Sequence, residues 1–476
     1  MKKPAQQRRK PVRRLYYSDN LPVLRKMESE SVDLIYLDPP FNSSRAYNII
    51  YPGDLGQVTA FEDTWYWTPQ CDLHLQQMRE GRDILVALVE AMGKVQMSAY
   101  LVNMAARLEE MRRILKPTGS IYLHCDPTAG HYLKIVMDAI FGVKNFRNEI
   151  VWCYSHGGKS KKHFGRKHDT IFFYTKGKDY VFNHRAVRIE MKSGRKSFGG
   201  RLETDESGRK YRLVYGSKNK RGKTRYYKYY LDEGKLPEDY WIDINSLQSK
   251  VAERLGYPTQ KPLALLERIV SASSNPGDLV LDPFCGCGTA AAAAEKLKRN
   301  WIGIDITYSA VAAIQERFRR QKLDIWGRIE ILGKPNTVEE VDRQLLDHSS
   351  ALYARKEFEK FCVATVGGLP NDRMGADGGV DGRIPLTTGE RAVCSVKSGR
   401  VDVKAVRELA GLLKGKDVAG VLLTRQPPTS AMVKFARQAG LHRPAKKDLL
   451  AVKPFPRLQI LTLEEILGGR RPELPV

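Results

Sequence analysis

The sequence predicts an α/β protein in which a Rossmann-like, mostly parallel sheet of seven strands precedes a smaller α/β unit. Two stretches predict the large sheet. Residues Val32–Leu37 are an apolar run typical of a strand buried on both faces. Pro39 and Pro40 then stop the strand, because neither can donate to a ladder. Residues 279–306 read as strand, glycine-rich loop, helix and strand. In open α/β sheets, ligand sites form beyond the carboxyl ends of such strands.

Length and charge limit the class of protein. At 476 residues the chain is long enough for two or three domains. Its formal net charge of +25 favours a polyanionic partner such as nucleic acid over a merely basic surface. The sequence contains no apolar run near the ~20 residues of a membrane helix, so no membrane partner is expected.

The N-terminus and the cysteines indicate the compartment. Residues 1–14 are basic without an apolar segment behind them, which predicts a disordered arm rather than a secretory signal. The seven cysteines are scattered, as expected in a reducing cytoplasm, so we predict a cytoplasmic protein. Cys285 and Cys287 lie close together, but no second Cys/His pair is near them, so we interpret them as loop residues and not as metal ligands.

Composition divides the chain into domains. We expect a main domain over residues 15–335, a linker over 336–349 and a second domain over 350–476. Within the main domain, residues 159–250 are rich in Lys, Arg, Gly and Tyr and weakly periodic. They are interpreted as an inserted nucleic-acid surface, with a solvated irregular insertion as the alternative. The candidate nucleic-acid-binding residues are Lys223, Arg225, Tyr226, Tyr227 and Lys228.

The expected elements follow from apolar spacing and from caps. Asp19 or Asn20 caps a short helix over 23–27, and a polar, aromatic stretch over 42–67 is interpreted as a lid or substrate loop. The other helices of the main domain are expected at 73–115, 131–141, 263–272, 290–297 and 308–321, and its other strands at 120–124, 149–154, 170–174, 279–281 and 301–306. In the second domain, helices are expected at 354–366, 404–413 and 430–439, and strands at 391–396 and 418–424.

The glycine-rich loop predicts a nucleoside cofactor. Gly286 and Gly288 let the backbone approach a ligand, and Asp305, at the end of the next strand, is placed to accept hydrogen bonds from two ribose hydroxyls. Ala291 stands where the dinucleotide fingerprint requires a third glycine, which disfavours an NAD enzyme.

Three motifs now resemble one family. Residues 282–289 (DPFCGCGT) resemble motif I of S-adenosylmethionine-dependent DNA amino-methyltransferases, and residues 38–41 (DPPF) resemble their catalytic motif IV. Residues 256–262 (GYPTQKP) resemble the segment before motif I in permuted members. The order is catalytic motif, basic insertion, cofactor motif, which is that of the β class, whose insertion is the target-recognition domain. The resemblance covers roughly residues 14 to 330.

The resemblance implies a catalytic site and a cofactor. Catalytic residues are expected at Asp38, Pro39, Pro40 and Phe41. Asp38 and the Pro39 carbonyl would accept the two amino N–H groups of a base flipped out of the duplex, and Phe41 would stack on it. S-adenosyl-L-methionine is the implied cofactor, and no metal is needed. The implied cofactor-binding residues are Asp19, Gln260, Lys261, Asp282, Phe284, Gly286, Gly288, Thr289 and Asp305.

The second domain resembles the Mrr-type restriction-endonuclease fold through residues 375–382 and 393–397. In that family, Asp381 would bind Mg²⁺ and Lys397 would assist the attacking water. Ser395 occupies the middle ligand position, and serine is a poor Mg²⁺ ligand. We therefore predict a nuclease-like domain kept for DNA binding or docking, with Mg²⁺ required only if it cleaves. Asp377, Asp402 or Glu408 is the candidate second carboxylate.

The sequence as a whole predicts a restriction–modification type DNA methyltransferase acting on adenine N6, because the resemblance associates an Asp-Pro-Pro start with adenine. The alternatives are a cytosine-N4 enzyme, a fused enzyme that also cleaves DNA, and a DNA-binding protein with a vestigial fold. RNA is not excluded as substrate by any residue. The partners consistent with this reading are double-stranded DNA, a second copy of the chain and a restriction enzyme.

Overall fold

A computed structural model describes most of the chain. Its description leaves out residues 1–10, 41–45, 51–56, 63–64, 79–82, 156–160, 191–200, 219–221, 249–250, 256, 258, 324, 347–350, 372–378 and 445–452. The predicted stacking residue Phe41 and the candidate carboxylate Asp377 therefore lie outside the described residues. Within the described part, no helix combines the length and apolarity needed to cross a membrane.

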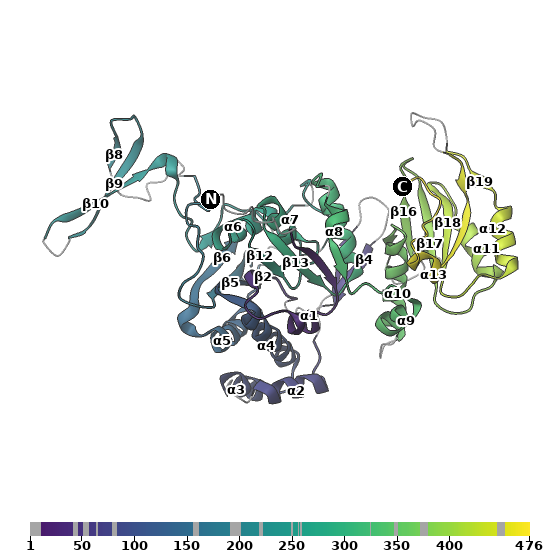
Figure 1. The fold of residues 1–476 in the computed structure, drawn as a ribbon, viewed down its shortest axis with the longest axis horizontal. Coiled ribbons are helices and arrows are strands. Elements are labelled where there is room, and N and C mark those ends of the chain that lie inside the picture. The colour runs from purple at the N-terminus through teal and green to yellow at the C-terminus, as the bar shows by residue number, and fades with distance from the viewer. Residues whose placement is uncertain are drawn as a thin grey trace, which may run out of the picture.

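The main domain is built on one nine-stranded sheet, ordered β11-β6-β7-β5-β2-β12-β13-β1-β14 (Figure 1). The strands are β1 (Arg13–Tyr17), β2 (Val32–Leu37), β5 (Leu115–Cys125), β6 (Phe146–Cys153), β7 (His168–Thr175), β11 (Tyr240–Trp241), β12 (Leu279–Asp282), β13 (Asn300–Asp305) and β14 (Glu330–Leu332). Only β7 runs antiparallel to its neighbours, β5 and β6. The sheet is therefore mostly parallel, as the sequence predicts.

Two details of the prediction are wrong. The sheet has nine strands and not seven, because the short strands β11 and β14 extend its two edges. The predicted end of the N-terminal segment at residue 14 is also wrong, since Arg13 and Arg14 already belong to β1. The side chain of Arg13 pairs with Glu295 at 2.6 Å and that of Arg14 with Glu330 at 2.8 Å, which ties this strand to its surroundings.

Helices cover both faces of the sheet. Residues of β2 alternate between the two sides: Leu34 and Tyr36 pack in one core cluster, and Ile35 and Leu37 in the other. The first face is covered by α6 (Leu263–Ser273), α7 (Thr289–Lys296) and α8 (Tyr308–Arg320), and the second by α1 (Asn20–Lys26), α4 (Gln96–Ile114) and α5 (Gly130–Phe141), with α2 (Pro69–Met78) and α3 (Asp83–Met92) packed outside them. A hairpin pairs β3 (Ala46–Ile50) with β4 (Gln57–Glu62), and 3-10 turns span Val143–Asn145, Leu231–Glu233 and Trp326–Arg328.

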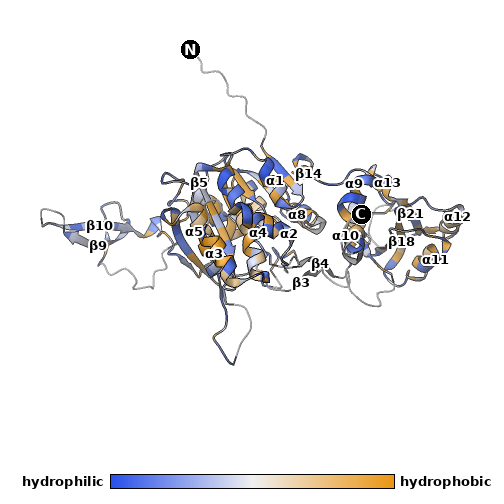
Figure 2. Ribbon diagram, turned by 90° about the horizontal axis from the view of Figure 1, so that it is seen from below, coloured by the Kyte–Doolittle hydropathy of each residue, from blue (hydrophilic) through white to orange (hydrophobic). Residues whose placement is uncertain are grey.

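The basic insertion forms a separate antiparallel sheet of β8 (Arg201–Thr204), β9 (Lys210–Lys218) and β10 (Thr224–Tyr230). We call this sheet the arm, because it projects from the main domain at the end opposite the second domain (Figures 1 and 2). The predicted limits of 159–250 are too wide, since β7 and β11 lie within those limits but pair in the central sheet.

The second domain has a five-stranded sheet of β15 (Leu369–Pro370), β16 (Gly382–Pro385), β17 (Arg391–Lys397), β18 (Asp417–Thr424) and β21 (Leu458–Thr462). Its helices are α10 (Ala351–Thr365), α11 (Val403–Gly411), α12 (Ser430–Gln438) and α13 (Leu463–Leu467), and β19 (Leu441–His442) pairs with β20 (Phe455–Pro456). The expected linker is helical, with α9 (Val338–Val341) followed by a π-helical turn (Asp342–Leu346).

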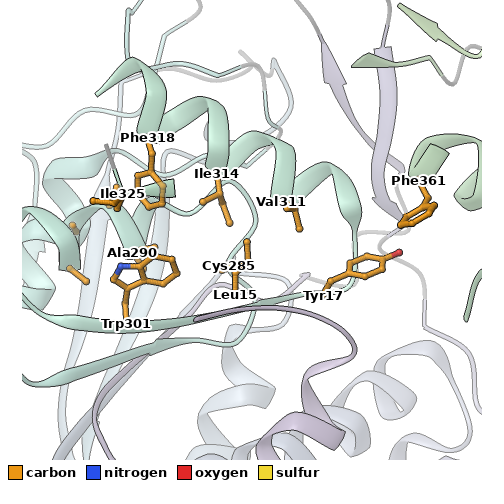
Figure 3. Packing of buried hydrophobic residues seen from close by; sticks show 14 of the residues in the cluster. Leu15, Tyr17, Cys285, Ala290, Trp301, Val311, Ile314, Phe318, Ile325 and Phe361 are labelled. Carbon is orange, nitrogen blue, oxygen red and sulfur yellow. The ribbon is translucent and has the colours of Figure 1, made fainter. Parts of the chain in front are cut away.

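The two domains share an apolar cluster. Val311 and Ile314 of α8 face Leu15 and Cys285, and Phe361 of α10 belongs to the same cluster (Figure 3). The apolar core of the main domain thus continues into α10 of the second domain.

Candidate active site

The sheet order creates a crevice between β2 and β12. From β12 the chain moves through α7 to β13 on one side, and from β2 it moves to β5 on the other. The strand order therefore reverses between these two parallel neighbours, and open α/β sheets bind ligands at such a point, beyond the carboxyl ends of the strands. Asp38 directly follows β2 and Asp282 ends β12, so both predicted residues border this crevice.

Asp38 has one paired and one unpaired oxygen. Its Oδ2 accepts from the Lys261 ammonium at 2.6 Å, and the two side chains are 14% and 9% exposed. Its Oδ1 is buried and has no hydrogen-bond partner among the described residues. A buried acceptor without a donor is unfavourable by about 1–3 kcal/mol, so this oxygen is suited to receive an N–H from a ligand. Pro39, also buried, removes the competing amide donor next to it.

The glycine-rich loop connects β12 to α7. Gly286 and Gly288 have φ values of +45° and +72°, which a glycine adopts without strain. A Cβ on Gly288 would lie 2.7 Å from Cγ1 of Ile314, so the loop also requires glycine for packing. Beneath it, the buried Arg317 guanidinium donates to the Cys287 carbonyl at 2.7 Å and to the Thr289 hydroxyl at 3.0 Å. Arg317 therefore fixes the loop from the core side.

Two carboxylates on the side of the crevice formed by β12 and β13 are buried. Burial raises the pKa of Asp282 well above its usual range, and the nearby Asp38 charge adds to that shift. Burial also raises the pKa of Asp305, although the Thr307 and Gly286 groups that donate to it oppose the shift. Asp305 Oδ2 accepts from the Gly286 amide at 2.9 Å, which joins the end of β13 to the loop. The strand–loop–helix unit and Asp305 fit a nucleoside that has two ribose hydroxyls.

Other predicted cofactor residues have structural partners. Asp19 caps α1 through the Leu21 amide and pairs with Arg107 at 2.9 Å. Gln260 is held within its own loop, where it accepts from the Leu255 amide at 2.8 Å. Phe284 packs against the core beside the loop, and Lys261 contacts Asp38. The structure thus brings Asp38, Lys261, Asp282, Thr289 and Asp305 to one crevice.

Sequence reasoning did not find a buried network on the β5 side of the crevice. His124 Nε2 donates to Asp169 Oδ2 at 3.0 Å, and the Tyr154 hydroxyl donates to Oδ1 at 3.1 Å. The Tyr36 hydroxyl lies 3.0 Å from His124 Nδ1. Burial acts to raise the pKa of Asp169, but the His124 hydrogen bond and the charge of Lys261 outweigh it, so this pKa is lowered. Asp169 lies in no local sequence motif, so the sequence gave no signal for its place in this network at the start of β7.

The arm exposes aromatic and basic side chains on both faces. Residues paired directly across antiparallel strands lie on the same face, so Tyr226 and Lys228 share one face with Tyr215. The rings of Tyr215 and Tyr226 lie 5.1 Å apart and are 62% and 60% exposed. Tyr227 and Tyr229 lie on the other face and are also exposed. Of the five predicted residues of the insertion, Arg225, Tyr226, Tyr227 and Lys228 are in β10 and Lys223 directly precedes it.

In the second domain, the Asp381 side chain is bonded to a backbone amide of the strand β17. Its Oδ2 accepts from the Val396 amide at 2.7 Å, and burial together with the Glu359 charge raises its pKa to about 6. Asp402 caps α11 and Glu408 lies 4.0 Å from Lys404. The acid whose charge acts on Asp381 is Glu359 of α10, and a helical Glu without a motif gave no signal in the sequence.

The residues of this cluster do not fit a Mg²⁺ site. Glu359 lies 3.2 Å from Arg355 and 2.9 Å from Lys356, although its Oε2 is buried without a hydrogen-bond partner among the described residues. Ser395 is buried in β17, two residues before Lys397, and brings no charge. No group of three His, Cys, Asp or Glu side chains arranged to hold a metal occurs among the described residues. Mg²⁺ takes several hard oxygen ligands, and the described residues bring two carboxylates here, of which Glu359 already pairs with cations.

Comparisons with known proteins show which family the chain resembles. The DNA adenine methyltransferase YhdJ of Escherichia coli K12 is 30% identical over 61% of this chain and 78% of its own length. The type II methyltransferase M.EcaI of Enterobacter cloacae is 29% identical over 63% of this chain and 68% of its own. A DNA modification methylase of Thermus thermophilus, solved with S-adenosyl-L-methionine, is 19% identical, with a TM-score of 0.37 over 68% of this chain and 99% of that one. The family model described as DNA methylase matches residues 32–316. The chain belongs to this family of DNA methylases, which act on N6 or N4 amino groups.

Proposed function

We propose that this chain transfers a methyl group from S-adenosyl-L-methionine to N6 of an adenine flipped out of double-stranded DNA. The observation that carries the proposal is Asp38 Oδ1 at the crevice between β2 and β12, which is buried without a hydrogen-bond partner in the described part of the chain. Asp282, Asp305 and the glycine-rich loop border one half of that crevice. The other half is left for the base.

The residues of the crevice suit the transfer chemistry. S-adenosyl-L-methionine supplies an electrophilic methyl group on a sulfonium sulfur. An aromatic amine delocalises its lone pair into the ring, so the site must draw that nitrogen toward tetrahedral geometry. Asp38 Oδ1 would accept one N–H and the Pro39 carbonyl the other. The two acceptors would stabilise the positive charge that develops on the nitrogen and hold the proton that it loses.

Two observations support adenine over cytosine. The E. coli relative is a DNA adenine methyltransferase, and the Asp-Pro-Pro start of the catalytic motif resembles adenine enzymes. The experiment that tests this is nucleoside mass spectrometry of unmethylated DNA incubated with the protein and S-adenosyl-L-methionine. We expect N6-methyldeoxyadenosine. If N4-methyldeoxycytidine alone were detected, cytosine would be the target base. If no methylated nucleoside were detected in DNA or RNA, a vestigial methyltransferase fold would be favoured.

The arm supports DNA as the substrate. Its exposed tyrosines offer rings to bases or sugars, and Arg225 and Lys228 offer cations to phosphates. We propose that it is the target-recognition region, and that it approaches the duplex while Asp38 holds the extruded base. Base extrusion is required because the amino group of a stacked base cannot reach the crevice.

For the second domain we propose a nuclease-like role in DNA binding or docking without cleavage. The closed Asp381–Glu359 cluster supports this reading. Incubating unmethylated DNA with the protein and Mg²⁺ tests it, and intact DNA is the expected result. Discrete fragments would instead establish a fused enzyme that methylates and cuts.

A further inference from the structure

We propose that Lys261 is a positioning residue for methyl transfer, which holds the Asp38 carboxylate from an anchor in the glycine-rich loop. The inference rests on the proposed function, because it assigns Lys261 a task only if Asp38 contacts the base. It differs from the cofactor-binding role that family resemblance implies for Lys261. Its starting point is the 2.6 Å contact between Lys261 Nζ and Asp38 Oδ2, which joins residues 223 positions apart.

The backbone of Lys261 is fixed on both sides. Before it, Thr259 has a φ of +57°, a left-handed conformation that is rare for a β-branched residue and needs surrounding support. Gln260 supplies that support, since its amide donates to the Glu253 carbonyl at 2.9 Å and its oxygen accepts from Leu255. After it, Pro262 is the N-cap of α6. The segment therefore presents the Lys261 side chain from a rigid base.

A second anchor joins this backbone to the glycine-rich loop. The Thr289 hydroxyl donates to the Lys261 carbonyl at 3.3 Å, and Thr289 is the first residue of α7. The buried Arg317 donates to the same hydroxyl at 3.0 Å. Lys261 is thus bonded through its main chain to the cofactor half of the crevice and through its side chain to the substrate half.

The ammonium group also serves several acids at once. Its charge opposes the rise that burial causes in the pKa of Asp282, and it contributes to the lowered pKa of Asp169. Asp38 follows β2, Asp282 ends β12 and Asp169 lies at the start of the antiparallel β7, so all three lie at the same sheet edge. A buried carboxylate without a counter-charge is strongly disfavoured, so Lys261 stabilises the ionised acid nearest the base.

The consequence for Asp38 is geometric. A carboxylate held by one oxygen cannot rotate freely, so Oδ1 keeps a defined direction. Lys261 donates to Oδ2 and leaves Oδ1 as the acceptor for the substrate amine. A group that orients the acceptor affects the rate at saturating cofactor, whereas a group that only holds the cofactor affects its affinity.

The experiment compares Lys261→Met, Lys261→Arg and, as a matched control, Lys296→Met. Lys296 of α7 pairs with Glu267 at 2.6 Å on the surface of the same domain. The rate of methyl transfer at saturating S-adenosyl-L-methionine and DNA, and the Kd for S-adenosyl-L-methionine, are measured for each. We expect Lys261→Met to lower kcat about 100-fold and change Kd by less than about threefold. Lys261→Arg should recover much of the loss, and Lys296→Met should match the wild type.

Two outcomes would overturn the inference: an unchanged kcat in Lys261→Met, or a weaker Kd with full kcat restored by excess cofactor. If Lys261→Met does not fold, Lys261→Ala, which also removes the donor to Asp38, is judged by the same two criteria. Failure of the proposed function is seen separately. A wild type that methylates no nucleic acid, or an Asp38→Asn variant with wild-type activity, would refute that function. An active wild type beside a fully active Lys261→Met would refute only the role of Lys261.

Discussion

Each of the two sheets carries an aspartate beside a lysine, but the two pairs differ in what they leave open. Asp38, after β2, gives one oxygen to Lys261 and keeps the other buried without a partner among the described residues. Asp381, before β16, accepts from the Val396 amide and lies near a second acid, Glu359, that has its own cations. The same residue types thus lie at a crevice between parallel strands in one domain, and against a backbone amide and a second acid in the other. Residue identity alone does not distinguish them.

Among the variants that test this comparison, Asp38→Asn is expected to have the largest effect. The amide keeps the shape of the side chain but loses the charge that the developing positive nitrogen requires, so we expect methyl transfer to fall about 1000-fold. The matched control is Asp33→Asn on the same strand, where Asp33 pairs with Lys116 at 2.7 Å away from the crevice. Single-turnover transfer of labelled methyl to DNA measures both. Equal losses of methyl transfer in the two variants would mean that reduced fold stability, and not the loss of the Asp38 carboxylate, is responsible.

The next test concerns the cofactor half of the crevice. Asp305→Asn can still accept from the Gly286 amide but loses its charge, so hydrogen bonds to ribose hydroxyls should weaken. We expect a Kd for S-adenosyl-L-methionine about 10- to 100-fold higher. Isothermal titration calorimetry of the variant and the wild type checks this. An unchanged Kd would place the nucleoside elsewhere.

A smaller effect is expected in the arm, where two arginines offer a matched pair. Arg209 is paired with Asp232 at 2.7 Å and with Glu233 at 3.3 Å, so its charge is already compensated. Arg225 lies in the aromatic strand β10. We expect Arg225→Ala to weaken DNA binding about tenfold and to reduce its salt dependence, and Arg209→Ala to leave it nearly unchanged. Fluorescence anisotropy at several salt concentrations distinguishes the two, and equal losses would contradict a binding surface on β10.

The smallest expected effect concerns the closed cluster. Because the pKa of Asp381 in the folded protein is raised to about 6, the native state binds more protons than the unfolded state between about pH 4 and pH 6. Stability should therefore fall as pH rises through that window, and the penalty is fully present above it. Asp381→Asn should flatten this part of the stability curve and stabilise the second domain by about 1 kcal/mol at pH 7.5.

Thermal unfolding at pH 4.5 and pH 7.5 measures the effect in Asp381→Asn, with Asp402→Asn as control. Asp402 caps α11 through the Lys404 amide, so its loss should bring no gain at pH 7.5. A rise in the wild-type Tm on adding Mg²⁺ that Asp381→Asn abolishes would contradict a closed cluster and restore a metal site.

The sequence predicted those features that depend on neighbouring residues. The strand before Asp38 and the loop with Gly286 and Gly288 follow from local pattern and turn chemistry, and the structure has both. The position of Asp305 at the end of β13 follows from the same reasoning. Strands as short as β11 and β14 carry too few residues for any period, which is why the sheet was expected to have seven strands.

Contacts across long stretches of chain could not be predicted. The pairing of Lys261 with Asp38 depends on how α6 and β2 are placed, and neither position carries a signal for the other. Asp169 is positioned by His124 of β5 and by Tyr154, which directly follows β6, and Glu359 by the packing of α10. The cofactor-binding roles of Lys261, Gln260 and Asp19 stay predictions, and their contacts with Asp38, Leu255 and Arg107 carried no signal in the sequence.

The two-sided exposure of the arm has an evolutionary consequence. Most side chains of β9 and β10 pack against little, so substitutions there should change stability by no more than about 0.5 kcal/mol. The crevice is the opposite, since Gly288 packs against Ile314, Arg317 donates to the loop and Asp38 is held by Lys261. If the arm has the recognition role proposed above, mutation could change the recognised sequence there without disturbing the residues of the crevice. A lineage of such enzymes would then diversify its DNA targets much faster than its reaction.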